Sequence, residues 1–142
     1  MYKRSELYVL TKTKDLAKYV ITITEKSPKK FRYTLVARLQ NYILDILECL
    51  HLANSYTRGS LERKALQEDA KRKLSMLDYF AQLAYEQECI LFKQFEQISK
   101  QVAECLMYLG KWMSSDRKKV STAKEVETEV DACGAGDIYE SE

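Results

Sequence analysis

Apolar residues recur at steps of three, four or seven along four successive stretches of the chain, with polar residues between them. In the first stretch the repeating positions are Val9, Leu16, Val20 and Ile23, which fall on one side of a helix. This spacing predicts an amphipathic helix over residues 5–25. A helix of this kind is expected to pack on its neighbours through its single apolar face.

The second and third helices are marked by their first residues. Ser27-Pro28 ends the first helix and is expected to begin the second, because serine is a favourable N-cap and proline fits the first helical position. Gly59 relieves backbone strain in the next loop, and Ser60 is expected to cap the third helix. The second helix is predicted over residues 28–55 and the third over residues 61–86. Their expected buried positions are Phe31, Leu35, Leu39, Tyr42, Ile46, Cys49 and Ala53, followed by Leu66, Ala70, Leu74, Leu77, Ala81 and Ala84.

The fourth stretch predicts a helix over residues 90–113, although residues 86–89 contain neither glycine nor proline to mark the break before it. Its expected buried positions are Leu91, Phe95, Ile98, Val102, Cys105, Leu109 and Trp112. Beyond Ser115 the apolar periodicity ends. We therefore expect residues 1–115 to form a four-helix domain and residues 116–142 to form a mobile charged tail.

Four helices of about 21 to 28 residues are each roughly 30 to 40 Å long. Joined by short connections, they predict an all-α fold, namely an antiparallel up-down-up-down four-helix bundle. Some apolar positions are left outside the assigned stripes, and this surplus predicts self-association. These positions are Ile21, Ile43, Leu44, Leu47, Leu50 and Tyr79.

Composition agrees with a helical protein that folds as one domain. The 142 residues include one proline and four glycines, so residues that build turns and strand ends are scarce. No apolar run approaches the roughly 18 residues of a membrane span, and no signal peptide is recognised. The four cysteines show no C-x-x-C spacing. We expect a cytoplasmic protein with reduced thiols and no contact with a membrane.

Charge is distributed unevenly along the chain. Residues 1–119 hold 22 Lys and Arg against 14 Asp and Glu, a balance of +8, whereas residues 120–142 hold one Lys against seven acids, a balance of −6. Clustered cations gain affinity for polyanions by releasing counterions from nucleic acid. Charged outer faces also keep any bundle in solution, so charge alone favours neither polyanion binding nor simple solubility.

The cations concentrate in the first quarter of the chain, where ten Lys and Arg accompany three acids over residues 1–38. Contacts from such residues to RNA or DNA would be made to phosphates and would discriminate poorly between sequences. Tyr8, Tyr33 and Tyr85, near the expected surface, could stack on bases, although a tyrosine at a bundle edge more commonly buries its ring. The candidate nucleic-acid-binding residues are Lys14, Lys18, Lys26, Lys29, Lys30, Arg32, Arg38, Arg72 and Lys73.

No catalytic or metal-binding set of residues can be assembled from the sequence. His51 is the only histidine, and with Glu48 and Cys49 beside it the three or four ligands of a zinc site are not complete. A di-iron bundle needs two Glu-x-x-His motifs and is excluded for the same reason. Glycine-rich phosphate-binding motifs and the G-x-S-x-G nucleophile motif do not occur. We expect no enzymatic activity, no metal and no cofactor.

Three short segments carry a resemblance to a known family. Ser27-Pro28-Lys29-Lys30 precedes the second helix, Leu52-Ala53-Asn54 ends it, and Leu109-Gly110-Lys111-Trp112 closes the fourth. Together with the four helix lengths, these segments resemble the accessory variability determinant proteins of diversity-generating retroelements over residues 1–115. Those proteins usually carry a second glycine at the position that Lys111 occupies here.

The resemblance implies an accessory protein that assembles as a homopentameric, barrel-like ring and binds the reverse transcriptase of the element. That complex copies a template RNA into mutated complementary DNA, which replaces part of a target gene. Positive charge on the ring is implied to engage nucleic acid and the polymerase, and only Lys29 and Lys30 lie in a matched motif. Gly110 and Trp112 also match, and we interpret them as packing residues, because a glycine within a helix is usually kept for close helix approach.

Two other interpretations stay open. The small four-helix-bundle proteins encoded in ribosomal RNA intervening sequences share the predicted architecture, but their Pro-Ala-Asn-Ile-Ala-Glu-Gly type of segment is absent here. The other is a scaffold that binds proteins through its helix faces and has no role with nucleic acid. A further hypothesis assigns the acidic residues 120–142 to screening the basic face when nucleic acid is absent.

Overall fold

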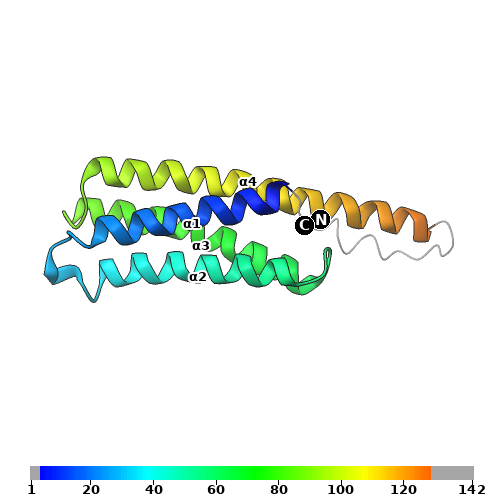
Figure 1. Cartoon of the computed structure of the whole chain (residues 1–142), viewed down its shortest axis with the longest axis horizontal. Coiled ribbons are helices and arrows are strands. Elements are labelled where there is room, and N and C mark those ends of the chain that lie inside the picture. Colours follow the sequence, from blue (N-terminus) through cyan, green and yellow to red (C-terminus); the bar gives the residue numbers. More distant parts are fainter. Residues whose placement is uncertain (1–3, 129–142) are drawn as a thin grey trace.

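The computed structural model describes the backbone of residues 4–128 and the side chains of residues 8–118 (Figure 1). It contains four α-helices: α1 (Arg4–Thr24), α2 (Leu35–Ser55), α3 (Leu61–Glu86) and α4 (Phe92–Thr128). A single turn of 3-10 helix, η1 (Lys29–Phe31), lies between α1 and α2, and no strand occurs within residues 4–128. The predicted all-helical four-helix bundle is confirmed.

Each helix packs mainly against two others. The principal contacts join α1 to α2 and α4, and α3 to the same two helices, so α1 and α3 occupy opposite corners of the bundle. In Figure 1 the α1–α2 and α3–α4 connections lie at one end, whereas the α2–α3 loop lies at the other. Helix α4 runs on past that loop. Within the described residues, no helix has both the length and the apolar character needed to cross a bilayer.

One apolar stripe from each helix fills the core. All four positions predicted for α1 are buried, as are Ala70, Leu74, Leu77, Ala81 and Ala84 of α3. In α2, Leu39, Ile46 and Ala53 are buried as predicted, whereas Leu35, Tyr42 and Cys49, together with Phe31 of η1, pack only at the margin of the core. The deepest line on α2 contains two residues that were assigned to the surplus, Ile43 and Leu50, which are fully buried.

The expected apolar surplus is therefore smaller than the sequence indicated. Ile43 and Leu50 face the core and Leu47 packs against it, because α2 lies between α1 and α3 and buries a broader face than a single stripe. Ile21, Leu44 and Tyr79 remain exposed, at 37%, 47% and 64%. Only these three members of the surplus are available to a partner.

The connection between α1 and α2 differs from the prediction. Pro28 does not begin α2: its φ of −56° and ψ of 141° are those of an extended residue, and the 3-10 turn follows it. Hydrogen bonds of the i to i+3 kind join Phe31 N to Pro28 O and Thr34 N to Phe31 O, at 3.0 and 3.2 Å. Helix α2 begins only at Leu35, after Thr34 leaves the helical region at φ −120°, ψ −94°. Aromatic and β-branched residues here are modest helix formers, which allows the break.

The two connections that flank α3 are closed by backbone geometry. Gly59 has the positive φ of 86° that glycine tolerates, and the Ser60 hydroxyl caps α3 by accepting a 3.2 Å bond from Arg63 N, as predicted. At the other end Glu88 has a φ of 63°, and Cys89 N donates to Ala84 O at 2.8 Å. This 6→1 bond closes the helix as a Schellman motif does, without glycine.

Helix α4 is longer than predicted at its C-terminal end. It starts at Phe92, where the Gln94 side chain accepts a 2.8 Å bond from Leu91 N, so Leu91 lies outside the core and is 69% exposed. The helix then continues to Thr128 instead of ending near residue 113. Part of the segment predicted as a tail is thus helical, while residues 129–142 lie outside the described residues, and the mobility of the tail stays a prediction.

Neighbouring positions on α2 test the depth of the core. Ile43→Ala should lower the free energy of unfolding by about 2–5 kcal/mol, because Ile43 is fully buried. Leu44→Ala removes a similar side chain that is 47% exposed and should cost less than about 1 kcal/mol. Urea denaturation followed by circular dichroism measures both values, and equal losses would contradict this burial pattern.

Candidate nucleic-acid interface

The segment between α1 and α2, residues 25–34, carries the densest exposed positive charge of the predicted site, and we call it the junction. Lys26, Lys29, Lys30 and Arg32 are all exposed there. Because the segment is a 3-10 turn with flanking turns, it crosses the end of the bundle (Figure 1) instead of following one helix face. Lys29 and Arg32 are three residues apart, a spacing that places side chains on the same side of a 3-10 turn.

A shallow hollow of about 480 Å³ lies between the junction and the first turns of α2. Lys29 and Arg32 line it together with Pro28 and Asn41. A hydrogen bond between two of its lining residues ties the two helices, because Gln40 Nε2 donates to Thr24 Oγ1 at 2.9 Å. Two cations, Lys29 and Arg32, and one acid, Glu25, line the hollow, so its charged lining has a net positive charge that suits a phosphate group.

A second hollow, of about 510 Å³, lies on the other side of the α2 N-terminus. Tyr33, Arg38, Phe80 and Leu83 line it, and it shares Asn41 with the first hollow. The Arg38 guanidinium carbon lies 5.7 Å from the ring centroid of Tyr42 and 5.4 Å from that of Phe80. These cation–π contacts hold the guanidinium against the α2–α3 surface. We call the surface that the two hollows form together, with Lys29 in the first and Arg38 in the second, the basic platform.

Two of the predicted residues are partly neutralised. Arg72 Nη2 and Lys73 Nζ each lie 3.3 Å from a carboxylate oxygen of Asp69. Burial opposes ionisation of Asp69, but hydrogen bonds from Cys49 and Lys73 and the charges of Lys73 and Arg72 lower its pKa overall. Desolvation opposes the charged form of Lys73, but the hydrogen bond to Asp69 and the Asp69 charge raise the pKa of Lys73 overall. Arg72 and Lys73 are thus engaged with an acid on their own helix.

The nine predicted residues do not form one surface. Lys14 and Lys18 lie on the exposed face of α1, one turn apart, while Arg72 and Lys73 lie on α3 at the opposite corner of the bundle. Lys26, Lys29, Lys30, Arg32 and Arg38 are the members that the structure brings together, at the end where α2 begins. The basic platform is therefore the candidate interface.

Gly110 does not pack in the way the sequence suggested. A Cβ atom built at this position meets nothing within 4 Å, and the residue is exposed, so none of the described helix residues approaches it closely. The interpretation of Gly110 as an internal packing residue is wrong for the isolated chain. Trp112, by contrast, is fully buried, and the Arg63 guanidinium carbon lies 4.8 Å from its ring centroid.

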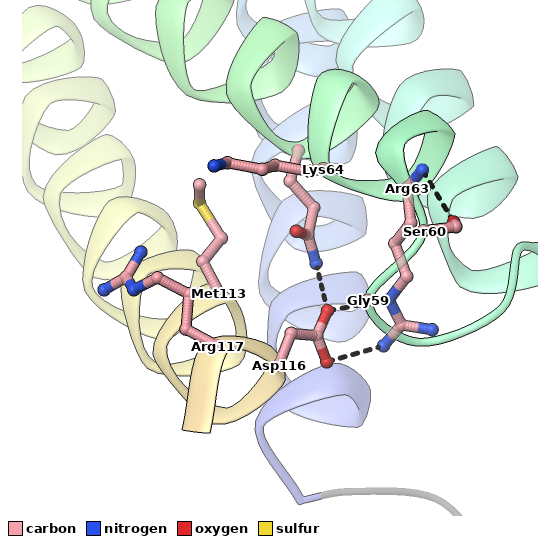
Figure 2. Close-up of a pocket in the computed structure, with 8 residues that line it drawn as sticks. Gly59, Ser60, Arg63, Lys64, Met113, Asp116 and Arg117 are labelled. Carbon is pink, nitrogen blue, oxygen red and sulfur yellow. Dashed lines mark hydrogen bonds and ion pairs between the residues drawn. The ribbon is translucent and has the colours of Figure 1, made fainter. Parts of the chain in front are cut away.

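A buried ion pair links α3 to α4 at the opposite end of the bundle (Figure 2). Arg63 Nε and Nη2 donate to the two carboxylate oxygens of Asp116, at 2.8 and 3.2 Å. Gln67 Nε2 adds a 3.1 Å bond to the same carboxylate, and Arg63 Nη1 donates to Tyr56 O at 3.1 Å. The Arg63 and Asp116 side chains are only 5% and 9% exposed. The network fixes α4 against α3 and the α2–α3 loop.

This network was not predicted from the sequence, because polar residues occupy inward positions in it. Arg63 and Gln67 precede Ala70 and Leu74 at steps of four, three and four, so they continue the buried line of α3. Asp116 lies seven residues after Leu109 in the same way. The sequence signal for the network was that polar residues occupy positions where the apolar repeat would place apolar ones, on two neighbouring helices. Beside the pair, Lys64, Met113 and Arg117 line a small hollow of about 60 Å³ (Figure 2).

The described cysteine thiols are held in their neutral form by their surroundings. Burial, a hydrogen bond to Asp69 and the Asp69 charge raise the pKa of Cys49 to about 11. Burial also raises the pKa of Cys105 to about 11, although the Thr13 hydroxyl, 3.6 Å from its sulfur, opposes the shift. Within the part of the chain that the structure describes, no three His, Cys, Asp or Glu side chains are placed to hold a metal ion.

No family model matches the chain, and no curated protein matches it.

The buried ion pair gives a prediction for stability. Asp116→Ala should lower the free energy of unfolding by about 3–5 kcal/mol, because it leaves the Arg63 guanidinium buried without its counter-charge. The control Glu104→Ala removes one partner of the exposed Lys12–Glu104 pair and should cost at most about 1 kcal/mol. In the double variant Arg63→Met/Asp116→Leu most of the loss should return. Chemical denaturation measures the free energy of unfolding of all three variants. If Asp116→Ala leaves this value unchanged, the ion pair does not stabilise the fold.

The raised thiol pKa values give a prediction for reactivity. In a Cys133→Ser variant, the remaining three thiols should react with iodoacetamide at pH 8 much more slowly in the folded protein than after unfolding in urea. Reactivity of Cys49 and Cys105 in the folded protein should rise only as the pH approaches about 11. Because these pKa values exceed the ordinary 9.0, the contribution of the two thiols to stability should be constant below about pH 9 and be lost as the pH rises to about 11. Rapid labelling at pH 8 would contradict this.

Proposed function

We propose that the chain is a non-catalytic accessory protein of a diversity-generating retroelement. In this role it binds the reverse transcriptase of the element, and it binds template RNA or complementary DNA through the basic platform. It thereby supports mutagenic retrohoming in the cytoplasm. Lys29 and Lys30, the two cations in the segment that resembles the family, both lie in the junction, and Lys29 lines one of the platform's hollows.

The observation that carries the proposal is the concentration of exposed cations at one end of the bundle. Five of the nine candidate residues meet there, and the hollow beside Lys29 and Arg32 is open to a ligand. One described acid, Glu25, also lines that hollow, and the next described acid along the chain is Asp45 on α2. Repulsion among so many like charges is a cost that a partner with phosphates would relieve.

The proposal includes assembly into a homopentameric barrel of antiparallel up-down-up-down bundles. The positions of the connections in Figure 1 support the helix directions. Gly110 and Met107 lie three residues apart on the exposed face of α4, and Met107 is 47% exposed. An outward glycine costs a helix up to about 1 kcal/mol against alanine, so its open side is best explained by the approach of another chain.

A scaffold that binds only proteins is the second candidate, and one feature favours it. Met76, Tyr79 and Leu83 form an exposed apolar row on α3, at 40%, 64% and 38% exposure, with the three-and-four spacing of one helix face. Such a row suits a partner helix or a second copy of the chain. Nucleic-acid binding that weakens with salt separates the two candidates, because the scaffold requires none.

The deciding experiment is co-purification with a reverse transcriptase encoded beside this gene, followed by size-exclusion chromatography with light scattering at low and high salt. A pentamer that retains the polymerase supports the proposal. A monomer that retains neither polymerase nor nucleic acid would refute it and leave the scaffold.

Charge reversal locates the nucleic-acid interface. The triple variant Lys29→Glu/Lys30→Glu/Arg32→Glu should weaken binding of a labelled oligonucleotide at least tenfold, and should reduce the slope of log K against log salt by roughly one per lost contact. The matched variant Lys71→Glu/Lys100→Glu/Lys111→Glu has the same net charge and changes exposed lysines on α3 and α4. It should bind within about threefold of the parent protein. Equal losses would show that only net charge matters.

A further inference from the structure

Among the three tyrosines expected near the surface, Tyr33 alone presents a free ring. Tyr8 packs on Tyr108 with ring centroids 5.3 Å apart, and Tyr85 packs on Phe92 and Phe95 at 5.3 and 6.0 Å. Tyr33 is 85% exposed and makes no ring contact with any described aromatic residue. The ordinary arrangement, in which a bundle tyrosine buries its ring and wets its hydroxyl, does not apply to it.

The exposed ring of Tyr33 lies at a hollow that a guanidinium group also lines. Tyr33 and Arg38 both line the hollow of about 510 Å³, whose remaining apolar lining comes from Leu35, Ala37, Phe80 and Leu83. Arg38 is exposed, and its guanidinium carbon lies 5.7 and 5.4 Å from the ring centroids of Tyr42 and Phe80, contacts that favour one placement of the guanidinium plane. A flat, polarisable group entering this hollow would meet an aromatic ring and a guanidinium plane, both of which stack on nucleobases.

The phosphate-binding side of the platform adjoins this hollow directly. Ala37 and Asn41 line both hollows. Lys29 and Arg32 therefore lie on one side of these two residues, and Tyr33 and Arg38 lie on the other. A base in one hollow and the phosphates of the same strand in the other would therefore be bound together. The Asn41 amide, between them, can both donate and accept hydrogen bonds at a base edge.

We propose that the basic platform binds single-stranded nucleic acid, with one unpaired base stacked at Tyr33 and Arg38 and the adjoining phosphates at Lys29 and Arg32. Resting on the proposed function, this inference adds the strandedness of the ligand and names the residue that selects it. A paired base has both faces covered by its neighbours in the duplex and cannot reach the Tyr33 ring. Bases and phosphates are common to RNA and DNA, so the two single strands should bind alike.

Fluorescence anisotropy with three labelled probes tests the inference: a 20-nucleotide pyrimidine-rich DNA strand, the RNA strand of the same sequence, and the 20-base-pair DNA duplex. The parent protein should bind both single strands at least tenfold more tightly than the duplex. Tyr33→Ala should weaken single-strand binding about tenfold, leave duplex binding unchanged and leave the salt slope unchanged, because no charge is lost. Tyr33→Phe should bind like the parent protein.

Two matched variants separate stacking from other effects. Tyr56→Ala removes a tyrosine that is 43% exposed at the opposite end of the bundle and should leave all binding unchanged. Arg38→Lys keeps the charge but removes the planar guanidinium, and should weaken single-strand binding severalfold at an unchanged salt slope. Circular dichroism melting confirms that each variant is folded, which the high exposure of Tyr33 leads us to expect.

The outcomes distinguish this inference from the proposed function. Single-strand binding that is unaffected by Tyr33→Ala, or lost equally in Tyr33→Phe, overturns the stacking role and leaves a basic surface that binds phosphates. Equal affinity for the duplex also overturns it. If the parent protein binds none of the probes even at low salt, both the inference and nucleic-acid binding by the platform fail.

Discussion

Burial of one apolar stripe from each of four long helices is the constraint on which the rest of this structure depends. Residues such as Leu16, Ile46, Leu74 and Ile98 are completely removed from solvent, one from each helix, and they hold together helices that would not be stable alone. A core made in this way uses the inner faces along the whole length of the bundle. Chemistry that needs contact with a ligand is therefore left to the outer faces and to the two ends.

The two ends use their polar residues in opposite ways. At the α2–α3 loop, Arg63 and Asp116 turn inward and satisfy each other, so charge there extends the packed region beyond the apolar core and fixes the register of α4. Such a pair specifies one arrangement of the helices more than it adds stability, since its desolvation offsets much of its attraction. At the junction, by contrast, cations point outward and meet no comparable network, which makes that end the one suited to a polyanion.

The junction owes its form to a local failure of helix continuity. Because α2 starts at Leu35 and not at Pro28, Lys29, Arg32 and Tyr33 lie on a 3-10 turn and the residues after it, across the end of the bundle. Had the helix begun at Pro28, the same side chains, at steps of three and four, would still have shared one face, but that face would have run along the side of α2. The break instead places them across the end of the bundle beside two hollows, and the proposed strand selectivity rests on that placement.

The sequence by itself determined the helical fold. Apolar residues such as Val9 and Leu74 belong to repeats at steps of three and four, and such repeats reflect the local geometry of one helix, whichever helix packs against it. It also determined the excess of positive charge in the first quarter of the chain. Only the tertiary structure decided that Ile43 faces inward, that Asp116 belongs to the packed region, and that Lys14 and Arg72 lie on opposite corners. These outcomes depend on which helices become neighbours, and periodicity within one helix carries no information about its neighbours.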